Sequence, residues 1–259
     1  MPSLYPSFSS AISELGRKLR YFGHEVSTAR WQGVDAPAPM RELLEADFRA
    51  PIIGDLDQLK KDIQPSLPWA DMHFEERVSG IPYNPPPSAQ YWPYNPGSKE
   101  FRESGKYTHT YPERFWPKYA GEGSTSPLRG IRYLYGDLND VIQLLRRDPL
   151  TRQAYLPVWF PEDTGAVHGG RVPCTLGYLF MNRRGYFHCT YYIRSCDYFR
   201  HFRDDIYLAA RLTLWILDQL KNDEDLKVHE SWKNVQPGFL NMYIGSLHCW
   251  LYETAKLPR

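Results

Sequence analysis

Cys174 has the residue type and the neighbours that nucleophilic catalysis requires. It follows Arg171-Val-Pro at the start of a segment rich in residues that favour strands. A cysteine attacks as its thiolate, and a cationic environment favours that form. A single cysteine in an aromatic strand is, however, most often a small buried apolar side chain. From this residue alone both interpretations stay open.

Polar residues follow Cys174 in a pattern that suits a nucleotide site. Arg194 and Ser195, near the end of a predicted strand, can bind a phosphate through a guanidinium and a hydroxyl. The alternative for Arg194 is an ion pair at the surface. Asp197 either caps the next turn or acts directly, and His248 is either a core histidine or a ligand.

The spacing of these residues resembles the catalytic core of the thymidylate synthase family. Arg194-Ser-Cys-Asp197 begins twenty residues after Cys174, and Asp205 lies eight residues after Asp197. The family has a Pro-Cys nucleophile, an Arg-Ser-x-Asp motif and a base-contacting residue in the same order and at the same spacing. The resemblance covers about residues 105 to 250. It implies that Cys174 is the nucleophile.

Two flanking segments extend the resemblance. Asp148-Pro-Leu-Thr-Arg152 is similar to the family's helix end with its phosphate-binding arginine, and Gly245-Ser-Leu-His248 is similar to its sugar-binding strand end. The resemblance implies a nucleotide site whose ligands divide into two sets: phosphate binding by Arg194, Ser195 and Arg152, and base or sugar binding by Asp205, Asp197, His248 and Trp250. It also implies a homodimer in which Arg152 crosses the interface into the partner's site.

Departures from ordinary thymidylate synthases indicate a cytosine substrate. Phe202-Arg-Asp-Asp205 stands where those enzymes have Pro-Phe-Asn in the base-contacting loop, and it is similar to the Phe-Arg-Asn-Asp of phage deoxycytidylate hydroxymethylases. Thr175 replaces a histidine, again as in the hydroxymethylases, and the chain ends soon after its Gly-Ser-Leu-His motif. A protonated aspartic acid, or aspartate with a bridging water, complements the N3 acceptor and 4-amino donor of cytosine. Asp204 is the alternative if the loop is shifted by one residue.

The activity implied is folate-dependent C5 hydroxymethylation of dCMP or CMP, through a covalent bond between Cys174 and C6 of the base. The one-carbon donor is 5,10-methylenetetrahydrofolate, and no metal is required. C5 methylation of dCMP or dUMP is the alternative, and an inactive nucleotide-binding relative is the second. Gln153, in place of the family's second arginine, favours the inactive relative, as does Trp250, in place of a tyrosine that holds the sugar hydroxyl.

Four residues of the first half complete the implied site. Tyr111, in Thr-Tyr-Pro, is similar to the family's active-site tyrosine. Glu76 is the general acid or base that we expect, with Glu75 as the alternate, although an acidic pair on a helix is often a solvated face. Trp92 either stacks on the folate ring or packs in an aromatic loop. Arg30 is the candidate for a phosphate ligand from the N-terminal loop.

Periodicity and end signals predict an α+β fold. The expected helices span residues 6–22, 40–48, 68–78, 138–147 and 205–220, and the expected strands span 153–160, 174–181, 186–193 and 239–244. We expect a single thymidylate-synthase-like domain over residues 1–259, with one main mixed sheet and a long buried helix. Residues 1–128 form a loop-rich half with many prolines and aromatics, residues 129–259 form the catalytic core, and 121–127 is the expected linker.

Composition and charge exclude several partners. Thirty-one Lys and Arg against thirty Asp and Glu leave a net charge of +1, which gives no basic surface for duplex nucleic acid or an anionic membrane. The longest apolar stretch, 206–217, is too short to cross a bilayer. The four cysteines lack paired CxxC spacing, and no secretory pattern opens the chain. We therefore expect a soluble cytoplasmic protein, in the host cytoplasm if a phage encodes it.

Overall fold

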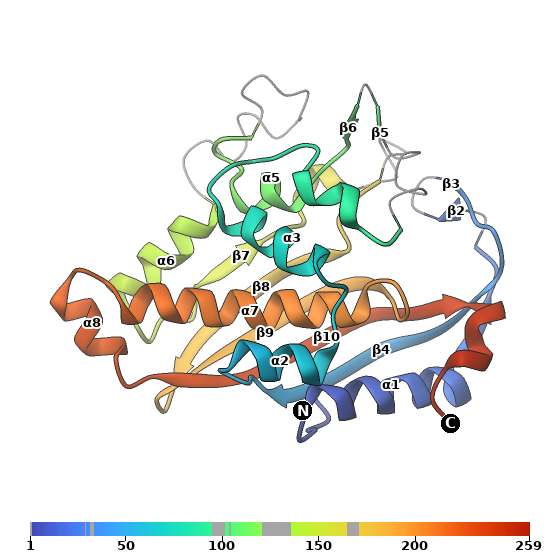
Figure 1. Cartoon of the computed structure of the whole chain (residues 1–259), viewed down its shortest axis with the longest axis horizontal. Helices are drawn as coiled ribbons and strands as arrows, with labels where there is room; N and C mark the ends of the chain where they lie inside the picture. The colour runs from blue at the N-terminus through green and yellow to red at the C-terminus, as the bar shows by residue number, and fades with distance from the viewer. Residues whose placement is uncertain are drawn as a thin grey trace.

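A six-stranded mixed sheet organises the chain into a single α+β domain (Figure 1). The computed structural model describes residues 2–28, 30–31, 34–94, 102–103, 105–120, 136–164 and 171–259. The sheet contains, in spatial order, β1 (His24–Val26), β4 (Met40–Pro51), β10 (Gln236–Trp250), β9 (Tyr186–Asp197), β8 (Thr175–Arg183) and β7 (Tyr155–Pro157). Neighbouring strands are antiparallel except β9 and β10, which are parallel. Two small hairpins lie outside this sheet: β2 (Arg30–Trp31) with β3 (Val34–Asp35), and β5 (Arg102–Glu103) with β6 (Lys106–Tyr107).

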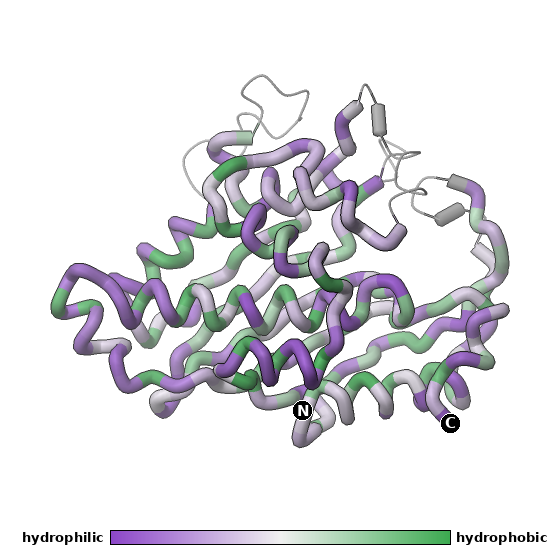
Figure 2. The backbone as a smooth tube through the Cα atoms, in the orientation of Figure 1, coloured by the Kyte–Doolittle hydropathy of each residue, from purple (hydrophilic) through white to green (hydrophobic). Residues whose placement is uncertain are grey.

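Helices pack on one face of the sheet, and the longest of them, α7 (Phe202–Lys221), lies across β9 and β10 (Figure 1). The other α-helices are α1 (Phe8–Phe22), α2 (Leu56–Ile63), α3 (Trp69–Val78), α5 (Tyr111–Phe115), α6 (Leu138–Arg147) and α8 (Leu226–Trp232), and the short 3-10 helices are η1 (Pro87–Tyr91), η3 (Pro161–Asp163) and η4 (Leu251–Lys256). Hydrophobic and hydrophilic residues alternate along α1 and α7, as expected of helices with one buried face (Figure 2).

Phe48 on β4 joins the two ends of the chain in one core. Its ring meets Phe8 of α1 and Phe202 of α7 edge-on, with ring centroids 6.3 and 6.2 Å apart. All three side chains are fully buried. The N-terminal helix therefore packs against the same sheet and the same long helix as the C-terminal half.

Local signals predicted several elements correctly. The helix at Leu138–Arg147 begins at Asp137, whose side chain accepts the backbone N–H of Asp140, and ends at Asp148 as predicted. The hairpin between β8 and β9 turns at Arg184 and Gly185, which both have positive φ. The predicted helices over 6–22, 68–78 and 205–220 correspond to α1, α3 and α7. The linker predicted at 121–127 lies outside the described residues.

The helix predicted over residues 40–48 is wrong, because this segment forms strand β4. Its Leu, Glu and Ala residues favour helices, but the segment pairs with β1 on one side and β10 on the other. Ala46, Phe48 and Ala50 are buried while the residues between them are not, which is the alternation of a strand. Tertiary pairing therefore overrides local propensity here.

Three further predicted boundaries differ from the structure. Strand β10 is fifteen residues long, because it continues as the partner of β4 beyond the predicted 239–244. Strand β7 is only Tyr155–Pro157, at the edge of the sheet. The expected base-contacting loop at 202–205 is the first turn of α7. Within the part of the chain that the structure describes, no helix is long and apolar enough to cross a membrane.

Gly177 is required where β8 pairs with β7. A Cβ at this position would contact the hydroxyl of Tyr155 and come within 2.7 Å of the backbone oxygen of Leu156. We expect Gly177→Ala to lower the free energy of unfolding by about 1–3 kcal/mol, because the β7 backbone must move. Urea denaturation followed by circular dichroism measures the change. Gly54→Ala is the control, since its Cβ would meet only Pro237 at 3.6 Å, and an equal loss in both variants would contradict the argument.

Candidate functional site

A cavity of about 480 Å³ lies where α3, α5 and η1 approach the sheet and the start of α7. We call it the central cavity. It collects predicted site residues from both halves of the chain: Trp92, Tyr111, Cys174, Arg194, Ser195, Asp197, Asp205 and His248. Residues that lie far apart in sequence therefore meet at one place.

Strand pairing positions the sheet residues of the site. The backbone N–H of Arg194 donates to the carbonyl of Cys174 at 2.9 Å, which sets the nucleophile candidate beside the arginine. In the parallel pair, Ser195 lies opposite Ser246 and Asp197 lies opposite His248. Because β9 and β10 run in the same direction, their functional residues reach the same edge of the sheet.

Cys174 is the accessible cysteine of the site, while Cys189, Cys196 and Cys249 are buried. Burial raises the pKa of the Cys174 thiol above its ordinary value. Arg194 and Arg171 act in the opposite direction, as a cationic environment should, and Asp205 adds to the rise. The predicted cationic effect on Cys174 therefore has the right sign, but burial outweighs it.

Arg194 presents a positive charge to the central cavity. Its Nε donates to the carbonyl of Pro173 at 2.9 Å, and its Nη2 donates to the carbonyl of Val172 at 3.2 Å. These bonds fix the guanidinium against the segment that precedes Cys174. No carboxylate among the described residues forms an ion pair with it. The charge is therefore held in place and remains available to an anionic ligand.

Asp205 and Asp204 both line the cavity, but their carboxyl groups differ. Asp204 accepts the backbone N–H of Ser66 at 2.6 Å. Asp205 accepts the thiol of Cys196 at 3.5 Å, and burial raises its pKa to about 7, against the lowering effect of Arg77. Near neutral pH the Asp205 carboxyl can therefore exist as an acid that donates one hydrogen bond and accepts another.

A chain of hydroxyl groups supports Tyr111 at the cavity wall. The Tyr111 hydroxyl lies 3.1 Å from the Thr175 hydroxyl, which lies 2.8 Å from that of Tyr191. The guanidinium of Arg77 stacks over the Tyr111 ring, 4.0 Å from its centroid. Thr175, which the sequence analysis noted only as a departure from histidine, thus orients Tyr111.

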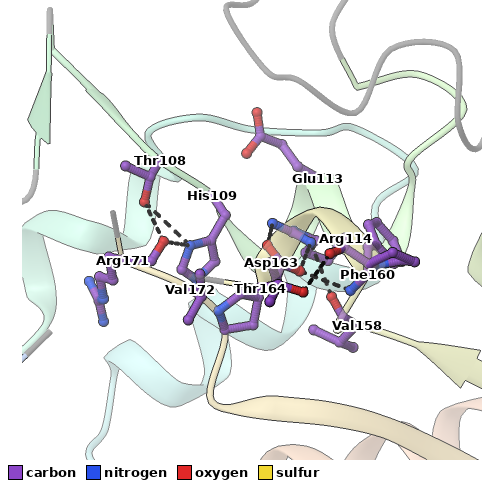
Figure 3. A network of polar contacts seen from close by, with 12 residues as sticks. Thr108, His109, Glu113, Arg114, Val158, Phe160, Asp163, Thr164, Arg171 and Val172 are labelled. Atoms are coloured by element: carbon purple, nitrogen blue, oxygen red, sulfur yellow. Dashed lines mark hydrogen bonds and ion pairs between the residues drawn. The ribbon is translucent and has the colours of Figure 1, made fainter. Parts of the chain in front are cut away.

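A buried ion pair holds the short helix that contains Tyr111 (Figure 3). Arg114 donates to both oxygens of Asp163, at 2.6 and 2.8 Å, and Asp163 also accepts the backbone N–H of Phe160. Nearby, the Thr108 hydroxyl donates to the carbonyl of Arg171 at 2.9 Å. These contacts tie α5 and the residues before it to the segment around η3 and to Arg171, both of which precede Cys174 in the chain.

Glu76 is buried behind the cavity wall and does not line the cavity. Its carboxylate accepts the Ser88 hydroxyl at 2.5 Å, the Ser88 backbone N–H, and lies 3.3 Å from His73 Nδ1. Burial alone would raise the pKa of Glu76, but the hydrogen bonds from His73 and Ser88 hold it below its ordinary value. The alternate, Glu75, is exposed and pairs with Arg211 at 2.5 Å, away from the cavity.

Two predicted ligands do not line the central cavity of this chain. Arg152 is exposed in the turn before β7. Trp250 is buried, and the strand end instead presents Ser246 and His248 to the cavity.

Glu42 on β4 is a cavity residue that the sequence analysis missed, and its carboxylate accepts the Ser246 hydroxyl at 2.5 Å. The sequence analysis missed Glu42 because it predicted a helix over residues 40–48, where the structure has β4.

Asp197 has the structural role that was one of its two predicted alternatives. Its Oδ1 accepts the backbone N–H groups of Phe199 and Arg200, each at 3.0 Å, and its Oδ2 pairs with the Arg200 guanidinium. Arg200 also pairs with Glu253 of η4 at 2.8 Å. The carboxyl of Asp197 therefore caps the turn and links it to the C-terminal segment.

Trp92 stands in an aromatic wall that can accept a flat ring. It stacks on His201, with centroids 5.5 Å apart and planes 18° apart, and lies 6.2 Å from Trp69. Its indole Nε1 is buried and has no hydrogen-bond partner among the described residues. Over the same residues, no group of three or more His, Cys, Asp or Glu side chains is arranged to hold a metal ion.

Comparison with protein-family models finds no matching family, and no curated protein matches the chain. The fold and the central cavity are therefore the basis of the functional argument.

The position of Arg194 predicts how Cys174 titrates. Removing its charge in Arg194→Gln should raise the pKa of the thiol further, because Arg194 lowers it in the folded protein. Alkylation of Cys174 by iodoacetamide should then reach half of its maximal rate at a higher pH than in the unchanged protein. Mass spectrometry of the labelled peptide measures the rate at each pH. Arg152→Gln is the matched control, and a shift of equal size in that variant would refute the assignment.

Proposed function

We propose that the protein is a folate-dependent pyrimidine nucleotide C5-hydroxymethyltransferase of the thymidylate synthase type, acting on CMP or dCMP. One observation supports this most. Cys174 just before β8, Arg194 on β9 and Asp205 on α7 line a single cavity. Their spacing in the sequence is the spacing of the family's nucleophile, phosphate ligand and base ligand.

Each of these groups has a distinct role in the proposed reaction. The Cys174 sulfur bonds to C6 of the pyrimidine, which turns C5 into a carbon nucleophile. Arg194 and Ser195 hold the phosphate, and this anchor fixes C6 near the thiol. 5,10-Methylenetetrahydrofolate, when bound, supplies the one-carbon unit that C5 receives. Water then adds to this carbon to give the hydroxymethyl group and the Cys174 sulfur leaves C6, whereas hydride in place of water would give the methyl product.

Asp205 supports cytosine as the base. Its raised pKa of about 7 allows a protonated carboxyl, which can donate to N3 and accept from the 4-amino group. Uracil offers the opposite pattern at these two positions. Asp204 is less suited to this role, because its carboxyl already accepts the backbone N–H of Ser66.

The aromatic wall around Trp92 fits the folate. Its stacked ring pair with His201 offers a flat apolar surface to a pterin. We therefore assign Trp92 to folate binding, with His201 beside it. We assign proton transfer at C5 to the side of the cavity behind which Glu76 is buried.

An open face of the sheet supports the homodimer. No described helix covers the face turned away from α7 (Figure 1). Tyr192 and Tyr243 stack with ring centroids 5.5 Å apart and are more exposed than Tyr191 and Met242 beside them, as expected of side chains on that open face. Tyr243 and Tyr155 remain about 40% exposed. Arg152 is exposed next to Tyr155, where a partner chain on this face can receive it. This arrangement fits a phosphate ligand that crosses the interface.

The direct test offers CMP, dCMP, UMP and dUMP, each tritiated at C5, with 5,10-methylenetetrahydrofolate. We expect tritium release from a cytidine nucleotide and a product whose mass corresponds to a hydroxymethyl group. Cys174→Ala should abolish release while nucleotide affinity stays within about tenfold, because only the covalent step is lost. A methyl product would establish the alternative reaction. Absence of release from all four nucleotides would leave only the binding relative.

Asp205→Asn tests the base assignment. The amide suits uracil better and mispairs with cytosine, and a mismatched buried polar contact costs about 1–3 kcal/mol. The ratio of kcat/KM for cytidylate to that for uridylate should therefore fall about ten- to a hundredfold. Asp204→Asn is the control and should leave the ratio near its original value. A change of the ratio in Asp204→Asn alone would make Asp204 the base-contacting residue, and a wild-type preference for uridylate, or an unchanged ratio in both variants, would contradict the cytosine assignment.

Subunit mixing tests the role of Arg152. Cys174→Ala and Arg152→Ala homodimers should each be inactive, whereas a heterodimer should contain one complete site, because both defects then fall in the same cavity and leave the other cavity intact. Activity after mixing and reassociation is the measurement, and sedimentation gives the oligomeric state. A monomer at micromolar concentration, or no recovery in a demonstrated heterodimer, would contradict the proposal.

A further inference from the structure

Three buried polar side chains lie together beside the central cavity: His73 and Glu76 on α3, and Ser88 on η1. Both oxygens of Glu76 already accept hydrogen bonds, one from the Ser88 backbone and the other from the Ser88 hydroxyl, with His73 Nδ1 at 3.3 Å. Glu76 itself does not line the cavity, whereas His73 and Ser88 do. The carboxylate therefore faces its neighbours, and His73 and Ser88 are the members of this group that reach the cavity.

The ring of His73 is fixed on two sides. It stacks on Trp69, with centroids 4.9 Å apart and planes 18° apart, and the ring of Tyr111 meets it edge-on at 6.2 Å. Since Nδ1 is turned toward Glu76 and Ser88, Nε2 is the nitrogen that this cavity-lining ring can offer to a ligand. Nε2 bonds to no described residue. A carboxylate at Nδ1 favours the tautomer with its proton on that nitrogen and a free electron pair on Nε2.

The surroundings also keep this ring neutral. Burial lowers the pKa of His73 to about 4, and the charge of Arg77 acts in the same direction, while Glu76 opposes them. The titratable groups around it are Glu76 and Arg77 on its own helix and Tyr111 on α5. From η1 it meets Ser88, which has no charge. A neutral imidazole with a free Nε2 is a proton acceptor at neutral pH.

We infer that His73 Nε2 is the atom that takes the proton from C5 of the nucleotide, and that Glu76 and Ser88 are positioning residues that fix the ring. This inference rests on the proposed function. When the C5–H bond breaks, its electron pair forms the double bond from C5 to the newly added carbon. The bond from that carbon to the folate nitrogen breaks at the same time, its pair stays on nitrogen, and Nε2 gains the proton.

The kinetic test compares three variants by C5 tritium release, nucleotide affinity and thermal unfolding. His73→Gln should lower kcat about 10²–10⁴-fold, the usual contribution of a general base, with affinity little changed. Glu76→Gln should lower kcat less and should move the acidic limb of the kcat profile to lower pH, because Glu76 raises the pKa of His73. Glu75→Gln, on the exposed side of the same helix, is the control and should match wild type.

A result in which His73→Gln keeps wild-type kcat while Glu76→Gln loses it would overturn the inference and make Glu76 the base, with the proposed function intact. Failure of the wild-type protein to release tritium from any nucleotide would contradict both this inference and the proposed function.

Nitrogen-15 NMR of the histidine side chains gives an independent readout. We expect a neutral His73 with its proton on Nδ1 and an Nε2 signal that shifts when CMP is added. A proton on Nε2, or a charged ring at pH 7, would overturn the inference.

Discussion

The parallel pairing of β9 and β10 is the constraint on which the site depends. The other neighbouring strands of the sheet are antiparallel, whereas β9 and β10 run in the same direction and therefore end at the same edge. Ser195 and Asp197 thereby lie beside Ser246 and His248, although the two segments are about fifty residues apart in the chain. Helix α7 follows β9 directly and begins at that edge, so its first turn adds Asp205 to the same cavity.

Burial at this edge sets the chemistry of the side chains. It raises the pKa of both Cys174 and Asp205 and lowers that of His73, so the three groups tend toward their neutral forms. Arg194 acts against this trend at Cys174, as Arg77 does at Asp205. A site of this kind is suited to groups that gain or lose a proton during a reaction, rather than to permanent ion pairs.

Local sequence signals predicted those parts of the fold that local interactions determine. The helix over residues 138–147 and the two strands joined by the turn at Arg184-Gly185 are examples, because each depends on residues close together in the sequence. Strand β4 was not predictable in this way. Its pairing with β10 joins residues about two hundred positions apart, and the alternation of Ala46, Phe48 and Ala50 is masked by helix-favouring neighbours. The prediction failed for β4 because the contacts that stabilise this strand come from residues far away in the sequence.

The same distinction explains which site residues the sequence could supply. Cys174, Arg194 and Asp205 lie on one continuous stretch, so their spacing was visible. Glu42 became a candidate only once β4 was placed next to the end of β10, where Ser246 donates to it. Glu76 was chosen by its helical spacing, but spacing does not reveal the depth of a side chain. Because Ser88 of η1 bonds the carboxylate, Glu76 is held back from the central cavity, and the histidine one turn before it on α3 lines the cavity instead.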